Sequence, residues 1–256
     1  RVMSSSFRPY RDEMIITTKA GYDMWPGPYG NWGSRKYLFA SLHQSLTRLN
    51  LEYVDIFYSH RFDPDTPLDE TLQALVDIVR QGKALYVGIS RWPYEAMQYA
   101  YAYLAARDVP CLIYQGRYNM LDRRIEQSGV IRQAHENGSG FTAFSPLEQG
   151  VLTDRYLDGI PVGSRASQER FLKSETITPE LVRKLRRLQD IASQRGQTLA
   201  EMSLAWLLKD ATVTSVIVGS SSTAQLADSL RCLDNICFSD DELRLIDETL
   251  FPKGLS

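Results

Sequence analysis

The sequence predicts an α/β protein in which a parallel sheet is covered by helices, and three observations favour this class. Short apolar runs alternate with helical stretches along the 256 residues, which is the pattern of consecutive β-α units. Each apolar run ends in polar residues, as expected where the strands of a barrel open onto a site. No GxGxxG sequence follows any of the runs, which disfavours the alternative of an open doubly wound sheet.

Six of the runs are expected to be strands because they are short and rich in β-branched and aromatic residues. They cover residues 14–18, 54–59, 84–89, 111–115, 140–144 and 215–218. A closed barrel of this type normally has eight parallel strands. We therefore expect a single-domain (β/α)8 TIM barrel over residues 1–256, with the first two β-α units absent and residues 1–11 forming the end of an earlier helix and loop.

Helical stretches are expected between and after these strands. They cover residues 35–49, 68–81, 94–106, 125–136, 179–208, 223–233 and 239–250. Ser34, Thr178 and Ser239 precede three of them and are typical N-cap residues, with Glu242 completing a capping box after Ser239. Residues 160–175 are polar and rich in turn-forming residues, so we expect a mobile loop there.

The composition is that of an ordinary globular protein, with 43% hydrophobic residues, 23% charged residues and a net charge of −2. This near-neutral charge gives no reason to expect nucleic acid or an anionic membrane as a partner. Cys111, Cys232 and Cys237 form no CxxC pair. We expect them to be reduced, core-type residues of a cytoplasmic protein, with neither a disulfide nor a metal site.

Polar side chains follow all six strands, at the end where the sites of parallel α/β proteins lie. The segments at these ends are 19–21 (Lys-Ala-Gly), 59–61 (Ser-His-Arg), 90–92 (Ser-Arg-Trp), 115–117 (Gln-Gly-Arg), 144–147 (Phe-Ser-Pro-Leu) and 219–222 (Gly-Ser-Ser-Ser). A sheet with a purely structural role does not need polar groups at every end. The pattern therefore indicates an active-site face.

Taken in this order, the segments resemble the aldo-keto reductase family. The resemblance is carried by residues 18–21, 53–61, 82–90, 145–147, 164–167 and 218–221. It extends from Tyr10 to about Leu250 and is greatest for the branch that contains the voltage-gated potassium channel β subunits and the bacterial L-glyceraldehyde-3-phosphate reductases. The fold that this implies is the eight-stranded barrel, in agreement with the strand count.

The resemblance implies that an aspartate, a tyrosine, a lysine and a histidine surround a substrate carbonyl. Lys19 and His60 match the lysine and the histidine, while the other two are expected in the absent β-α units. A nearby ammonium lowers the pKa of a tyrosine, which is otherwise near 10 and too high for an acid at neutral pH. His60 would orient the carbonyl oxygen. The alternative for His60 is a hydrogen-bonded core histidine. The alternatives for Lys19 are a Schiff-base lysine or a structural ion pair. His43 and His135 are expected at the surface.

The resemblance also implies a nicotinamide cofactor. Ser90, Arg91 and Gln115 match residues at the nicotinamide amide, and Phe144 matches the ring that stacks on the nicotinamide, with plain core packing as the alternative. Ser145, Pro146, Leu147, Gln149 and Gly150 match the loop along the pyrophosphate, and Gly219, Ser221, Gln225 and Asp228 match the adenosine end. Arg155 and Arg165 match basic residues that pair with the 2′-phosphate, so the implied cofactor is NADPH.

The loop after the Lys19 strand is expected to bind substrate. Trp25, Tyr29 and Trp32 would make a tight pocket for a small carbonyl compound, and Arg35 at a helix start would bind an anion such as a phosphate. The alternative is a loop that packs on its own aromatic rings, with Ser34 serving only as a cap.

The expected function is NADPH-dependent reduction of small aldehydes or ketones, such as glyceraldehyde 3-phosphate or methylglyoxal-like compounds, to alcohols. One alternative is an NADPH-binding regulatory subunit with little turnover, and another is a Schiff-base aldolase that uses Lys19. A homo-oligomer is the expected assembly.

Overall fold

The structure is a computed structural model that describes residues 5–252, and these residues form two compact units. Unit 1 contains the described residues up to Gly116 together with Ser128–Phe141, and unit 2 contains Arg117–Gln127 and the described residues from Thr142 onward. Of the segment 1–11 that was expected to end an earlier helix, residues 1–4 lie outside the described part, and Arg8–Glu13 form a 3₁₀ helix.

The elements of unit 1 alternate between strand and helix. They are η1 (Arg8–Glu13), β1 (Thr17–Ala20), α1 (Arg35–Leu49), β2 (Val54–Ser59), α2 (Leu68–Arg80), β3 (Ala84–Ser90), α3 (Tyr94–Ala105), β4 (Cys111–Arg117), α5 (Val130–Glu136) and the start of β5 (Gly140–Phe144). The strands follow one another in the sheet in chain order, without the reversal that marks a doubly wound sheet.

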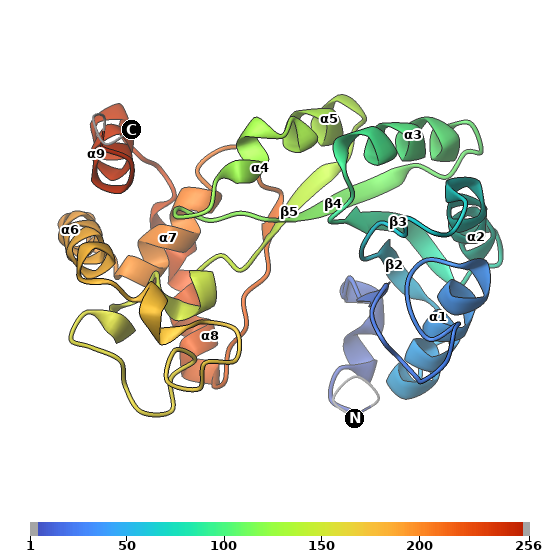
Figure 1. Ribbon diagram of the computed structural model, residues 1–256, viewed down its shortest axis with the longest axis horizontal. Helices are drawn as coiled ribbons and strands as arrows, with labels where there is room; N and C mark the ends of the chain where they lie inside the picture. The colour runs from blue at the N-terminus through green and yellow to red at the C-terminus, as the bar shows by residue number, and fades with distance from the viewer. Residues whose placement is uncertain (1–4, 253–256) are drawn as a thin grey trace. The chain divides into compact units, whose positions relative to one another are not determined.

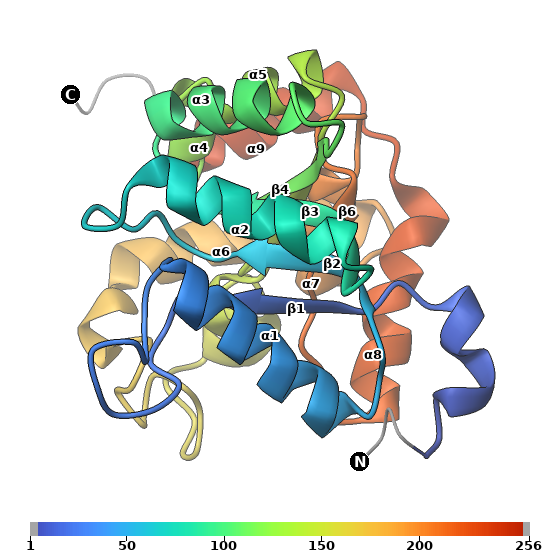
Figure 2. The same ribbon diagram turned by 90° about the vertical axis from the view of Figure 1, so that its right-hand side faces the viewer.

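Helices α1, α2 and α3 lie on the same side of strands β2, β3 and β4 and run alongside them (Figures 1 and 2). The α2 sequence explains this placement, because Leu72, Leu75 and Val76 recur at helical spacing and are fully buried. Phe57 and Val87 of the paired strands β2 and β3 are fully buried as well. Apolar burial between helix and sheet therefore forms the core of unit 1.

Unit 2 is mainly helical. Its elements are α4 (Arg124–Gln127), η2 (Glu148–Gly150), η3 (Asp154–Tyr156), η4 (Ser174–Thr176), α6 (Pro179–Gln194), α7 (Leu199–Leu207), β6 (Ser215–Val216), α8 (Thr223–Leu230), η5 (Arg231–Asn235) and α9 (Asp240–Leu250). Thr142 and Ala143 of β5 pair with β6 in parallel. Helix α7 is buried at every residue except Ala200 and contacts α6, α8 and η5, so it is the central element of this unit.

The sequence expectations for two helices were too long, because each contains a glycine in a left-handed conformation. The helix expected at 125–136 is divided into α4 and α5 near Gly129 (φ 76°), and the helix expected at 179–208 is divided into α6 and α7 near Gly196 (φ 69°). Left-handed backbone ends an α-helix, and glycine adopts it without a steric penalty. Helix α7 then begins after Thr198, which forms a capping box with Glu201.

Strand β1 covers Thr17–Ala20 and not residues 14–18, because η1 extends to Glu13 and the Met14 N–H bonds back to the Arg11 carbonyl (3.2 Å). Ile16, just ahead of the strand, already contacts Asp55. The Ile16 N–H donates to Asp55 Oδ2 (2.7 Å), while its carbonyl accepts from the Asp55 N–H (2.8 Å). The last strand ends at Val216 and not at residue 218. Cys111, Cys232 and Cys237 are free thiols as expected, but Cys237 is exposed and is not a core residue.

Replacing Thr198 with alanine should lower the free energy of unfolding by about 1 kcal/mol, since the cap satisfies a backbone N–H at the start of the central helix. Chemical denaturation followed by circular dichroism measures this. The matched control is Thr176→Ala, at an exposed position in η4, which should change the value by less than about 0.5 kcal/mol. Equal effects of the two substitutions would contradict the importance of the cap.

Candidate active site

The carboxyl ends of β1 and β2 bring Lys19 and His60 to one edge of unit 1. The two strands pair in parallel with Lys19 opposite Tyr58, and the His60 N–H donates to the Ala20 carbonyl (2.8 Å). Gly21 permits the close approach: its φ is 148°, and a Cβ there would lie 3.1 Å from the His60 Cβ. The expected meeting of lysine and histidine at adjacent strand ends is therefore what the structure contains.

Lys19 lies over an aromatic ring, and its side chain pairs with no carboxylate within residues 5–252. Its Nζ is 4.8 Å from the centre of the Tyr58 ring, and burial lowers the pKa of its ammonium group. The ring occupies space that Gly88 leaves open, since a Cβ at Gly88 would lie 2.6 Å from it. The row Lys19–Tyr58–Gly88 follows the register across three strands, so Gly88 helps to place the lysine.

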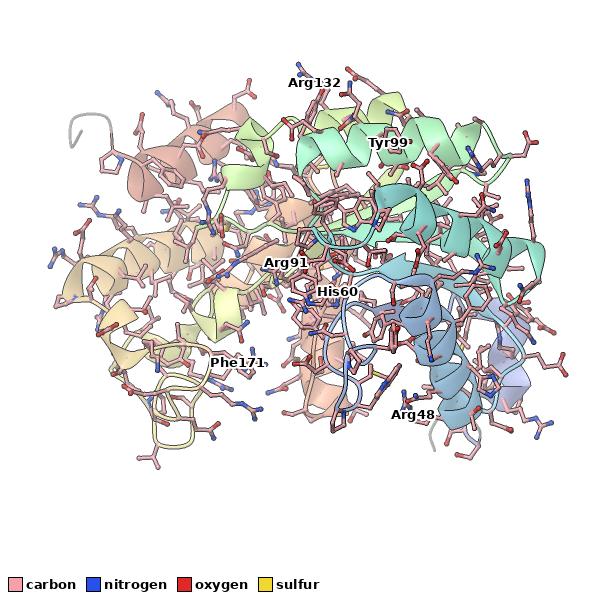
Figure 3. The ribbon with its side chains drawn as sticks, turned by 45° about the vertical axis from the view of Figure 1, so that its right-hand side comes forward. Arg48, His60, Arg91, Tyr99, Arg132 and Phe171 are labelled. Carbon is pink, nitrogen blue, oxygen red and sulfur yellow. The ribbon has the colours of Figure 1, made fainter. Side chains whose placement is uncertain are left out.

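His60 is surrounded by positive charge. Burial, followed by the charges of Lys19, Arg91 and Arg61, lowers its pKa from the ordinary 6.5 to about 4. Its ring meets the Tyr22 ring edge-on, with 4.8 Å between centroids. Figure 3 shows His60 and Arg91 near each other in unit 1, with Arg48 at a distance from both. At neutral pH His60 is therefore an uncharged imidazole that can donate one hydrogen bond.

Arg61 is held between two aromatic rings beside His60. Its guanidinium carbon is 4.3 Å from the Tyr22 ring centre and 3.8 Å from that of Trp32. Its Nε donates to the Gly21 carbonyl, and Nη2 donates to Asn31 Oδ1 (2.7 Å). These contacts tie the loop after β1 to the end of β2.

Tyr37 of α1 anchors the turn that presents Tyr22. The Tyr37 hydroxyl accepts from the Gly21 N–H (3.0 Å) and donates to the Tyr22 carbonyl (2.5 Å). Its side chain is fully buried. The Tyr22 hydroxyl in turn accepts from Arg91 Nη1 (2.7 Å). The buried Tyr37 therefore fixes the turn after β1. Tyr22, which this turn presents, links His60, Arg61 and Arg91.

Ser90 and Gln115 are buried polar residues with unsatisfied atoms. They lie opposite each other in the register of β3 and β4. Ser90 Oγ and Gln115 Oε1 have no hydrogen-bond partner in the described residues. Buried polar groups are normally paired, and a hydroxyl and an amide oxygen suit the two ends of a carboxamide group. Both residues therefore fit the nicotinamide amide that the sequence resemblance implies for them.

The expected substrate loop does not bring its aromatic residues together. Trp25 packs on Tyr37 (5.5 Å between ring centroids), whereas Lys36 Nζ lies 4.6 Å from the Tyr29 ring centre. Of the three aromatic residues, Trp32 is the one that contacts Arg61, which directly follows His60. Trp25 therefore packs on a core residue of α1, so neither the expected tight substrate pocket nor a loop packed on its own aromatic rings describes the three residues.

Arg35 has protein carboxylates as partners. Its Nη1 pairs with Asp77 Oδ2 (2.5 Å), and its backbone N–H donates to Glu70 Oε1 (3.1 Å). Ser34 caps α1 by accepting from the Tyr37 N–H. The helix start that was expected to bind an anion of the substrate thus already faces carboxylates of α2, and a structural role for Arg35 is favoured.

In unit 2, the expected pyrophosphate loop adopts a strained backbone. Ser145, Gln149 and Gly150 have φ values of 54°, 60° and 96°. Such conformations are costly for residues other than glycine and occur most often at functional sites. Asn119 holds the loop, since its Nδ2 donates to the Ser145 carbonyl (2.9 Å) and to Glu148 Oε2 (2.6 Å). Phe144 and Leu147 are half-buried and Pro146 is buried.

The two arginines expected at the 2′-phosphate differ in their surroundings. Both are exposed. Arg165 donates from Nη1 to Gln149 Oε1, so it is attached to the strained loop. For the Arg155 side chain, no hydrogen bond or ion pair occurs with any other residue from 5 to 252. The structure therefore brings Arg165, but not Arg155, to the predicted cofactor residues.

The residues expected at the adenosine end lie around the start of α8. Ser221 donates from its N–H and its hydroxyl to Gln225 Oε1, both at 2.9 Å. Asp228 is paired with Arg231 (2.8 Å), which also contacts Glu201. A Cβ at Gly219 would meet nothing within 4 Å, so the backbone there does not require a glycine.

Four residues that shape these sites were not predicted from the sequence, namely Tyr22, Tyr37, Asn119 and, in its role, Arg61. Arg61 carried a local signal, because it directly follows His60, and Tyr22 likewise follows Gly21 at the end of a strand. Tyr37 and Asn119 act through contacts across the unit, for which the sequence offers no local signal.

A parallel β/α sheet with polar residues at its strand ends is typical of α/β enzymes, among them the β/α barrels. The sequence profile described as "Aldo/keto reductase family" matches residues 1–250, and the chain belongs to this family. The family has the (β/α)8 barrel fold, so the expected fold class is confirmed.

The chain is 52% identical over 252 residues to L-glyceraldehyde 3-phosphate reductase of Escherichia coli O157:H7, covering 97% of this chain and 73% of the relative. It is 34% identical over 232 residues to the probable voltage-gated potassium channel subunit beta of Arabidopsis thaliana, covering 88% and 70%. Both branches named from the sequence resemblance are therefore represented among its relatives. The chain is an aldo-keto reductase with similarity to an enzyme named for reducing an aldehyde.

Two further findings concern the described residues only. No helix within residues 5–252 is long and apolar enough to span a membrane. The same residues contain no group of three or more His, Cys, Asp or Glu side chains arranged to bind a metal ion.

The pKa of His60 should be about 4 in the folded protein. Histidine ring signals followed by NMR against pH measure it, and the His60→Asn variant identifies the signal. Because the unfolded chain binds this proton near pH 6.5 and the folded protein only near pH 4, the free energy of unfolding should fall as the pH drops through that window. The fall should be smaller in His60→Asn. A His60 pKa of 6.5 or above would contradict the positive surroundings described here.

Proposed function

We propose that this protein reduces small aldehydes or ketones to alcohols with NADPH. The observation that carries the proposal is the meeting of Lys19 and His60 at one edge of unit 1, with Ser90 and Gln115 buried and unsatisfied at the ends of the following strands. Glyceraldehyde 3-phosphate and methylglyoxal-like compounds are the candidate substrates, the first because of the name of the relative with 52% identity.

A bound nicotinamide would supply the hydride that reduces the carbonyl carbon. Ser90 Oγ would donate to the oxygen of its carboxamide, and Gln115 Oε1 would accept from the carboxamide nitrogen. Arg91 would contact the same end of the cofactor. The residues proposed for the remainder of the cofactor are Phe144, Ser145, Pro146, Leu147, Gln149, Gly150, Arg155, Arg165, Gly219, Ser221, Gln225 and Asp228.

His60 would donate a hydrogen bond to the carbonyl oxygen. It is uncharged at neutral pH because of its lowered pKa, so it orients and polarises the carbonyl without being the main source of the proton. Lys19 is a cation whose side chain pairs with no carboxylate of the described residues. Its charge favours the ionised form of an adjacent acid and stabilises negative charge that develops on the oxygen.

A second candidate is an NADPH-binding regulatory subunit with little turnover. It is favoured by the relatives named as potassium channel β subunits, which are 34% identical to this chain. Cofactor-binding residues alone serve either function, so turnover separates the two. We further propose that the protein works in the cytoplasm, which its three free cysteines support, and that it assembles as a homo-oligomer.

Steady-state assays with NADPH and a panel of small aldehydes test the proposed function. Lys19→Met should lower kcat by roughly 10²–10⁴-fold, the usual contribution of proton-transfer catalysis, while the dissociation constant of NADPH stays the same. The matched control is Lys83→Met, at an exposed lysine ahead of β3. Activity at the wild-type level in Lys19→Met would remove Lys19 from the mechanism, and an inactive wild type that binds NADPH would favour the regulatory alternative.

The protein should bind NADPH more tightly than NADH, because arginine forms paired, charge-assisted hydrogen bonds with phosphate. Such bonds contribute roughly 1.5–3 kcal/mol each, so Arg165→Ala should weaken NADPH binding about tenfold or more. Binding of NADH should change little. Quenching of tryptophan fluorescence gives both dissociation constants, and Arg170→Ala, at an exposed arginine beside Phe171, is the control. An NADPH preference that persists in Arg165→Ala would show that this arginine does not read the 2′-phosphate.

A further inference from the structure

We propose that Arg61, which Tyr22 links to Arg91, binds a phosphate group of the substrate beside His60. The preferred substrates would then be small aldehydes that carry a phosphate monoester. The proposal rests on the proposed reductase function, because it concerns the selectivity of the same site.

The first observation is that the positive charges around His60 have no counter-ion. Lys19, Arg61 and Arg91 form no ion pair with a carboxylate anywhere in the described part of the chain; their side chains contact an aromatic ring, a backbone carbonyl, an amide and a hydroxyl. Other arginines of unit 1 are paired, such as Arg11 with Asp55 (3.0 Å). Asp23 reaches Arg61 only through Asn31, whose Nδ2 donates to Asp23 Oδ1 (2.5 Å). Three neighbouring cations that pair directly with no carboxylate of the described residues indicate a place for a multiply charged anionic ligand.

The second observation is the way in which Arg61 is held. Tyr22 and Trp32 cover the faces of its guanidinium group, and the Nε and Nη2 atoms are bonded to Gly21 and Asn31. Its Nη1 has no hydrogen bond within residues 5–252. A guanidinium group fixed in this way presents its remaining N–H groups as a preorganised donor edge, the geometry that suits phosphate oxygens.

The third observation is that Tyr22 joins the two arginines to the carbonyl-binding residue. Its ring contacts both Arg61 and His60, and its hydroxyl accepts from Arg91 Nη1. Trp32 and Arg91 also have left-handed backbones, with φ values of 71° and 56°. Strain of this kind persists where the surroundings enforce it, often at ligand sites. An anion here would lie close to His60, so the reducible carbonyl and the phosphate must be separated by only a short chain.

The helix start at Arg35 is a weaker place for the same phosphate. Its N–H and its side chain already bond to Glu70 and Asp77, and these carboxylates would repel a phosphate. A phosphate monoester carries about −1.5 to −2 charges at pH 7, so it is drawn to Arg61, which pairs with no carboxylate of the described residues.

The test compares kcat/KM for glyceraldehyde 3-phosphate and for glyceraldehyde, which have the same reacting end. The ratio of the two should fall by roughly ten- to hundredfold in Arg61→Gln, in keeping with the loss of one or two charge-assisted bonds. Arg48→Gln, at an exposed position on α1 away from His60 (Figure 3), is the matched control and should keep the wild-type ratio. An unchanged ratio in Arg61→Gln, or a fall in Arg35→Gln in its place, would overturn the proposal.

Binding measurements provide a readout that does not need turnover. Glycerol 3-phosphate should raise the pKa of His60 in the wild type, because a bound anion offsets the neighbouring cations, whereas glycerol should not. The shift should be lost in Arg61→Gln and kept in Arg48→Gln. An inactive wild-type protein that shows this shift would contradict the proposed reductase function but support the anion site. An active wild-type protein without the shift would support the reductase function and contradict the anion site.

The same phosphate chemistry is present in the cofactor, so a further measurement separates the two sources. The dissociation constant of NADPH should be the same in wild type and Arg61→Gln, as judged by fluorescence quenching. Weakened NADPH binding together with an unchanged substrate ratio would assign the arginine to the cofactor and overturn the proposal. Arg61→Lys, which keeps the charge but loses the planar donor edge, should give an intermediate ratio if the loop remains folded.

Discussion

The pairing of β1 with β2 is the interaction on which the site depends. Parallel strands in register bring their carboxyl ends to the same edge, and the hydrogen bond from the His60 N–H to the Ala20 carbonyl extends that register to the last residue. Gly21 lets the two chain segments approach where a side chain would crowd His60 and Arg61. The backbone positions then determine where the side chains of the site lie, namely those of Lys19, His60, Arg61 and Tyr22.

This arrangement concentrates positive charge at an edge where no carboxylate of the described residues pairs with Lys19, Arg61 or Arg91. Partial burial disfavours the charged form of the half-buried Lys19, and together with the neighbouring cations it keeps His60 uncharged at neutral pH. The surrounding structure tolerates this through aromatic contacts to Tyr58, Tyr22 and Trp32 and through the buried anchor Tyr37. An anionic substrate, or negative charge that develops on a carbonyl oxygen, would offset this positive charge. Active sites often hold such unfavourable arrangements because the reaction then makes them favourable.

Much of the fold could be predicted from the sequence, because local patterns determine it. Helix α1 and strands β2 and β5 have the predicted bounds, since their apolar periodicity is bounded by clear signals such as Ser34. The breaks at Gly129 and Gly196 also had local signals, which the longer apolar pattern concealed. The start of strand β1 was misplaced because the 3₁₀ helix η1 extends to Glu13 and bonds to Met14, the residue where the strand was expected to begin.

The site was less predictable, because its contacts depend on tertiary structure and not on local sequence patterns. Lys19 and His60 follow from strand ends and from family resemblance, whereas the partners of Arg35 and Arg61 depend on where other elements lie. Arg35 occupies a helix start that resembles an anion site, but Asp77 and Glu70, far along the chain, reach it. Arg61 has only its position after His60 as a signal, and its aromatic clamp comes from a loop some thirty to forty residues earlier.

Direct transfer of a labelled hydride tests the central claim, that this site reduces a carbonyl with NADPH. The protein would be incubated with glyceraldehyde and NADPH that carries deuterium on the transferable position of the nicotinamide, and the alcohol analysed by mass spectrometry. The account predicts one deuterium bound to carbon in the product, formed at a rate that depends on protein concentration. Unlabelled alcohol, or no alcohol above the protein-free control, would contradict it.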